Sequence, residues 1–112
     1  MKTKTALTTT FIALLTALAF TARAAEPKEL WDKNCAACHG KDGKGETKMG
    51  KKAGVKDYTD PKVHESLKED KAFKSVKEGL KEGDKELMKP FSGKLTDDEI
   101  KSLITYVKSF RK

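Results

Sequence analysis

The two cysteines of the chain constrain its fold more than any other feature. Cys35 and Cys38 lie three positions apart, and His39 follows directly. A disulfide between them would close a loop too short to add much stability. The 112 residues are 37% hydrophobic and 37% charged, which predicts one small domain with a limited core and excludes a multidomain enzyme. Because such domains usually need extra support, we expect a buried cofactor to supply part of the core.

The N-terminal segment has the pattern of a secretory signal. Lys2 and Lys4 precede an apolar stretch over residues 6–20, and Ala22-Arg23-Ala24 offers the small residues that a signal peptidase accepts. The apolar stretch of about 15 residues is shorter than the roughly 20 that a membrane-spanning helix needs, which disfavours an uncleaved anchor. We predict a signal peptide over residues 1–24, with cleavage after Ala24 or one residue later, and export to the periplasm.

Residues 25–112 then form the mature domain. The signal removes three of the 24 basic residues and no acid, so the domain carries 21 basic and 17 acidic side chains, a net charge of 21 − 17 = +4. This modest charge, on an exported chain without a basic helix face, excludes nucleic-acid binding. With no other long apolar run, the mature domain is expected to be soluble, without stable membrane insertion, and monomeric.

Short helices separated by long loops are expected along the domain. Thr96 and Glu99 form a capping box for the last helix, and Asp60-Pro61 is a typical start for a middle one. Glycines and lysines over residues 40–54 indicate a loop, and residues 81–86 a charged connector. No sustained alternation of apolar and polar residues is present, so the predicted fold class is all-α. Helices are expected at residues 27–35, 61–67, 72–79 and 96–110.

The pattern Cys35-Ala36-Ala37-Cys38-His39 predicts covalent attachment of one haem. At this spacing both thiols can add to the two vinyl groups of a haem, and the adjacent histidine can bind the iron. Two alternatives use the same cysteines. A zinc site would need two further ligands, and His64 is the only other histidine. A thioredoxin-like dithiol would need βαβ strands that the sequence lacks.

Taken together, these features resemble the small class I monohaem c-type cytochromes. The resemblance rests on the helix before the attachment motif, the glycine and lysine loop, Met88 ahead of Pro90-Phe91, and the capped last helix. It implies an all-α fold around one haem c. It also implies thioether bonds at Cys35 and Cys38, His39 as the proximal iron ligand and Met88 as the distal one.

Several details accompany this ligand assignment. Met49 lies only ten residues after His39, a short path to the opposite face of the haem, so Met88 is the better candidate. Because no proline follows the motif closely, a carbonyl within residues 48–54 is expected to accept the His39 N–H. His64 has polar neighbours and is expected on a solvated helix face. The apolar wall of the haem site is expected from Trp31, Leu87, Phe91, Leu103 and Val107.

A six-coordinate iron with histidine and methionine ligands suits an electron carrier rather than an enzyme, because it leaves no position for substrate. The chain is therefore expected to shuttle electrons between redox partner proteins. A cluster of lysines after the motif could guide docking to acidic patches on those partners. The alternatives are a five-coordinate haem sensor or catalytic haem protein and a haem-free thiol-disulfide oxidoreductase. The lysines of the cluster are Lys41, Lys44, Lys48, Lys51, Lys52 and Lys56.

Overall fold

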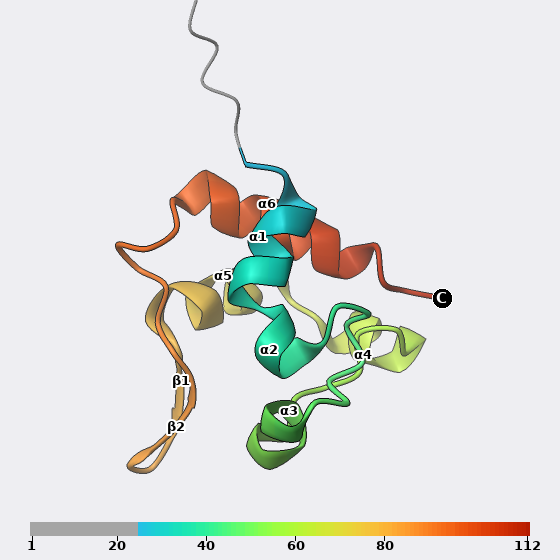
Figure 1. Ribbon diagram of the computed structural model, residues 1–112, viewed down its shortest axis with the longest axis horizontal. Helices are drawn as coiled ribbons and strands as arrows, with labels where there is room; N and C mark the ends of the chain where they lie inside the picture. The colour runs from blue at the N-terminus through green and yellow to red at the C-terminus, as the bar shows by residue number, and fades with distance from the viewer. Residues whose placement is uncertain (1–24) are drawn as a thin grey trace, which may run out of the picture.

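The computed structural model describes residues 25–112, a succession of short helices with one small hairpin (Figure 1). The predicted signal peptide and its cleavage site lie outside the described residues. In chain order the elements are α1 (Pro27–Asn34), α2 (Ala36–His39), α3 (Lys48–Ala53), α4 (Pro61–Ser66), α5 (Glu69–Glu78), β1 (Leu80–Glu82), β2 (Lys85–Met88) and α6 (Asp97–Lys108).

The core lies where α1 crosses α6 (Figure 1). Trp31, only 2% exposed, packs with Leu30 of the same helix against the apolar stripe of α6. On α6 the apolar residues recur at i, i+3 and i+4, which places Ile100, Leu103 and Ile104 on one buried face. The first and last helices of the domain are thus held together directly.

Two of the predicted helix starts are confirmed. Thr96 and Glu99 form the expected capping box at α6, since the Thr96 side chain accepts the Glu99 N–H while the Glu99 carboxylate accepts the Thr96 N–H. At α4 the Asp60 carboxylate accepts the Lys62 N–H at 2.9 Å, and Pro61 occupies the first helical position. Local side-chain chemistry alone determines both starts.

Two segments that were predicted to be irregular contain regular structure. Residues 48–53 form α3, because the Thr47 hydroxyl accepts the Gly50 N–H at 2.8 Å and Gly54 ends the helix in the left-handed region. The expected connector at residues 81–86 is part of the β1–β2 hairpin, whose turn is Gly83-Asp84. Its strands carry mainly charged side chains, so the sequence lacks the alternation of apolar and polar residues that would predict strands.

None of the helices in residues 25–112 combines the length and apolar character needed to cross a membrane.

Candidate functional site

The cysteine pair lies on a single helical turn at the centre of the molecule (Figure 1). Cys35 ends α1 and begins α2, and its carbonyl accepts the N–H groups of Cys38 at 3.2 Å and His39 at 2.9 Å. Residues three apart on a helix share a face, so the two thiols project on the same side with the histidine beside them. Both side chains are half-buried, and no disulfide joins them.

The electrostatics of Cys35 disfavour dithiol redox chemistry. Burial, and then the neighbouring thiol of Cys38, raise the pKa of Cys35 to about 11. Thiol-disulfide oxidoreductases need the opposite shift, because the thiolate is the attacking species. A half-buried thiol that stays protonated is instead compatible with a structural role, such as covalent attachment of a cofactor.

The His39 imidazole lies between two aromatic rings. The Tyr58 ring stacks on it at 5.5 Å between centroids with 21° between the planes, and the Trp31 ring lies at 5.6 Å. Burial lowers the pKa of His39, which favours the neutral imidazole that binds metals. The His39 ring is therefore flanked by two aromatic rings, and its neutral form, which metal binding requires, is favoured.

The predicted acceptor for the His39 N–H is wrong. His39 Nδ1 is buried without a hydrogen-bond partner, so no carbonyl of residues 48–54 accepts from it. The reason is that α3 and the residue before it contact the Cys38 carbonyl of α2 rather than the His39 ring. The Thr47 hydroxyl donates to the Cys38 carbonyl at 2.6 Å, and a Cβ at Gly50 would lie 2.2 Å from that same oxygen. Only glycine permits this packing.

Met88 lies at the end of β2, half-buried and paired with Leu80 of β1. The segment after it is fastened to the end of α5, where Phe91 N–H donates to the Val76 carbonyl at 2.9 Å. At Gly79, with φ of +77°, an added Cβ would lie 2.6 Å from the Met88 carbonyl. Met49, the other methionine of the mature domain, is 57% exposed on α3.

The prediction that His64 lies on a solvated face is wrong, because the side chain is half-buried. Its Nε2–H donates to the Tyr58 carbonyl at 2.5 Å. Sequence reasoning also missed Tyr58 itself, although an aromatic residue in the polar turn Asp57-Tyr58-Thr59 is a usable signal. Residues 25–112 bring together no group of three or more His, Cys, Asp or Glu side chains fit for a metal, which leaves the zinc alternative without ligands.

Comparison with known proteins identifies the family of the chain. Residues 22–107 match the family model described as cytochrome c oxidase, cbb3-type, subunit III. The chain belongs to this family of c-type cytochromes. It is similar to the solved structure of the KustC0563 c-type cytochrome, with 30% identity, a TM-score of 0.70, and coverage of 79% of this chain and 100% of that one.

A second solved structure, a tyrosine-to-phenylalanine mutant of the same cytochrome, is similar at 29% identity and a TM-score of 0.68, covering 78% of this chain and all of the other. No curated protein gives a significant match. The family and the structural likeness confirm the expected small monohaem c-type cytochrome and its fold class, with the small β1–β2 hairpin as the departure from an all-helical chain.

A c-type cytochrome carries covalently bound haem c and serves haem-based electron transfer. The residues present fit that group: two cysteine side chains share one helical turn, and beside them lies a half-buried imidazole. In haem c both cysteines form thioether bonds, so the haem-free oxidoreductase alternative is excluded. Proteins of this family usually act as carriers, and c-type cytochrome domains are typically exported.

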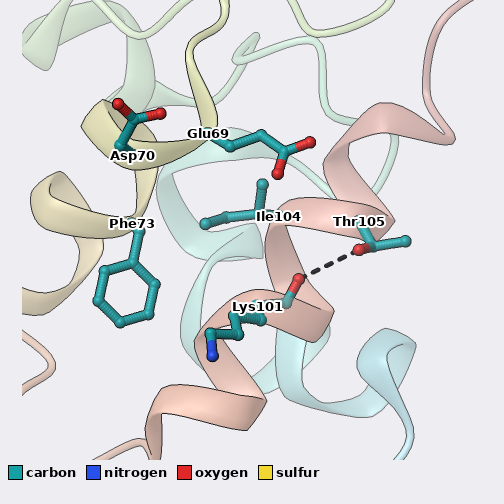
Figure 2. Close-up of a pocket in the computed structure, with 6 residues that line it drawn as sticks. All are labelled: Glu69, Asp70, Phe73, Lys101, Ile104 and Thr105. Atoms are coloured by element: carbon teal, nitrogen blue, oxygen red, sulfur yellow. Dashed lines mark hydrogen bonds between the residues drawn. The ribbon is translucent and has the colours of Figure 1, made fainter.

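A separate groove of about 420 Å³ lies between α5 and α6 (Figure 2). Its lining includes the apolar side chains of Phe73 and Ile104 and the charged side chain of Lys101. None of its lining residues belongs to the attachment motif or to the Met88 segment. The groove is therefore distinct from the haem site.

Proposed function

We propose that this cytochrome is a soluble periplasmic electron carrier that shuttles single electrons between redox partner proteins. Cys35 and Cys38 would form the thioether bonds, His39 would be the proximal iron ligand and Met88 the distal one. The observation that carries the proposal is the geometry at α2, where the half-buried side chains of Cys35 and Cys38 lie on one helical turn beside the His39 imidazole.

The haem supplies the one-electron step, and the side chains determine how easily it occurs. A neutral imidazole and a thioether fill both axial positions, so no substrate site remains and the protein acts as a carrier rather than as an enzyme. The thioether favours the ferrous state and raises the potential. Burial of the surrounding apolar wall acts in the same direction, because a ferric site is poorly solvated there. Trp31 and Leu103 of that wall are buried, and Leu87, Phe91 and Val107 are half-buried.

The sequence supports export and the domain limits. Haem attachment of this kind accompanies export, and residues 1–24 have the charge and apolar pattern of a signal peptide. Residues 25–112 would then be the mature, monomeric domain. N-terminal sequencing of the exported protein should begin at Ala25 or Glu26.

Docking to an acidic partner is proposed for the face that carries α3. Lys48, Lys51 and Lys52 are exposed there, beside the exposed Met49. Because α3 packs directly against α2, charges on this helix lie close to the attachment motif. Association with an acidic partner should weaken with added salt, and Lys51→Glu with Lys52→Glu should slow it most at low ionic strength.

The deciding experiment is absorption spectroscopy of the exported protein when oxidised, reduced, and reduced under carbon monoxide. A haem c spectrum that carbon monoxide does not change is expected if Met88 closes the site. A spectrum that changes readily would contradict the distal ligand and favour a five-coordinate sensor or catalytic site.

A further inference from the structure

Something other than a hydrogen bond must orient the His39 ring in this chain. Its Nδ1 is buried without a partner, whereas an accepting group at that atom would normally fix both the tautomer and the rotation of the ring. The aromatic rings of Tyr58 and Trp31 do lie against the imidazole. The orientation of His39 therefore depends on what holds these two rings.

Trp31 is fixed within the core. It is 2% exposed, and its indole N–H donates to the Gly40 carbonyl at 2.9 Å. Tyr58 is different, because it lies in a turn between α3 and α4, outside any helix or strand. Its ring packs against the core and lies 6.5 Å from the Trp31 ring, and hydrogen bonds of its backbone hold the turn that carries it.

Two hydrogen bonds fasten the Tyr58 backbone from opposite directions. Its N–H donates to the Gly43 carbonyl at 2.8 Å, and its carbonyl accepts from His64 Nε2 on α4. The carbonyl has no proton, so Nε2 must carry the hydrogen. The half-buried His64 is thus linked to His39 indirectly: it binds the Tyr58 carbonyl, and the Tyr58 ring stacks on the His39 imidazole.

We propose that His64 is a positioning residue of the haem site. Its hydrogen bond to the Tyr58 carbonyl holds the Tyr58 ring parallel to the His39 imidazole, and this contact fixes the proximal ligand in place of an acceptor at Nδ1. The inference rests on the proposed ligation by His39. It predicts that a residue which does not touch the haem ligand still influences the reduction potential.

The test compares three variants of the exported, haem-loaded protein. His64→Leu removes the donor, His64→Gln keeps an N–H that can reach the same carbonyl, and Glu65→Gln changes an exposed residue on the same helix. The measurements are the reduction potential, the NMR signals of the His39 ring, hydrogen exchange of the Tyr58 amide, and thermal unfolding.

His64→Leu should lower the reduction potential, because a looser Tyr58 ring admits water to the proximal side. Its His39 signals should broaden or double, and exchange of the Tyr58 amide should accelerate roughly five- to tenfold, the effect of losing one hydrogen bond. His64→Gln should stay close to the unmodified protein in all three measurements, and Glu65→Gln should not differ from it.

A lower unfolding temperature for His64→Leu, with unchanged potential and His39 signals, would overturn the proposal, since it would show a purely structural role. Rapid exchange of the His64 Nε2 proton in the unmodified protein would overturn it too, and that measurement needs no variant. If the unmodified protein lacked histidine ligation, the proposed function would fail instead, while Tyr58 exchange would still report whether His64 holds the turn.

Discussion

The two proposed iron ligands lie in very different surroundings. On the proposed proximal side, His39 lies between aromatic rings and next to the α1–α6 core, and Trp31 alone contacts four other aromatic side chains. On the proposed distal side, Met88 lies at the end of a hairpin whose residues are mostly exposed. The polypeptide therefore builds one side from its own core and supplies the other from a short two-stranded hairpin.

This contrast separates two contributions to function. The proximal side has buried apolar contacts within the polypeptide core, so substitutions there should mainly lower the free energy of unfolding. The distal side has few such contacts, and backbone bonds such as the one from Ser92 N–H to the Lys77 carbonyl, at 3.0 Å, hold it to α5. Substitutions there should mainly change the ligation and the reduction potential of the iron, and they should change the free energy of unfolding little.

The largest expected effect is on the proximal side. Trp31→Ala should reduce the free energy of unfolding by about 3 to 5 kcal/mol, because a buried aromatic side chain is replaced by a cavity. It also leaves the Gly40 carbonyl without its donor. Denaturant unfolding of the haem-loaded protein measures the loss.

Leu80→Ala is the matched control for Trp31→Ala, since Leu80 is a large apolar residue that is 45% exposed in the hairpin. Its cost should be well under that of Trp31→Ala. Similar losses for both variants would remove the proposed difference between the two sides.

The next effect tests the distal side. Met88→Ala should open the iron to carbon monoxide and lower the reduction potential by an appreciable part of the roughly 0.8 V range that axial ligands span. The free energy of unfolding should change less than for Trp31→Ala, because Met88 is only half-buried. Spectra and potentiometry of the exported protein check both expectations.

Met49→Ala is the control for Met88→Ala, because Met49 is 57% exposed on α3. It should leave the spectrum and the potential unchanged. If Met49→Ala opened the iron and Met88→Ala did not, the distal ligand would have to be reassigned.

The same contrast explains which parts of the structure could be predicted from sequence. The α6 helix follows from local signals, namely the Thr96 and Glu99 capping box and the spacing of Ile100, Leu103 and Ile104. The proximity of the two thiols to His39 follows from the spacing of the motif on one helical turn. Both are short-range properties, which sequence patterns record directly.

Long-range contacts were less visible in the sequence. The stacking of Tyr58 on His39 joins residues 19 positions apart, and no periodic pattern relates them. The acceptor expected for His39 Nδ1 was predicted wrongly, and the contact of His64 with Tyr58 was not predicted, since each depends on where a loop lies in space. The β1–β2 hairpin was missed because its strands, rich in charged residues, show no alternation of apolar and polar side chains. The pair Gly83-Asp84 is nevertheless a typical turn sequence.

A smaller effect is expected where α6 begins. Thr96→Ala should cost about 1 kcal/mol of unfolding free energy, because the Glu99 N–H loses its acceptor. Thr105→Ala, farther along the exposed side of the same helix, should cost less. Equal losses in thermal unfolding would show that the cap does not stabilise the α1–α6 core.

The smallest effect concerns the turn that carries Tyr58. The Asp57 carboxylate accepts hydrogen bonds from the Thr59 side chain at 2.6 Å and from the Thr59 backbone N–H at 2.8 Å, and these bonds lower the pKa of Asp57 below 3.8. A carboxyl whose pKa is lower in the folded state stabilises the fold above its unfolded pKa, and this contribution is lost as the pH falls through the folded value.

Asp57→Asn should therefore lower the unfolding temperature slightly at pH 7, and the difference from the unmodified protein should shrink as the pH falls through the lowered pKa of Asp57 in the folded state. Asp84→Asn, in the hairpin turn, is the control, because Asp84 is exposed. A difference that persisted at low pH would assign the effect of Asp57→Asn to the shape of the turn rather than to the ionised carboxylate. The charge of Asp57 would then add nothing to the stability of the turn that carries Tyr58.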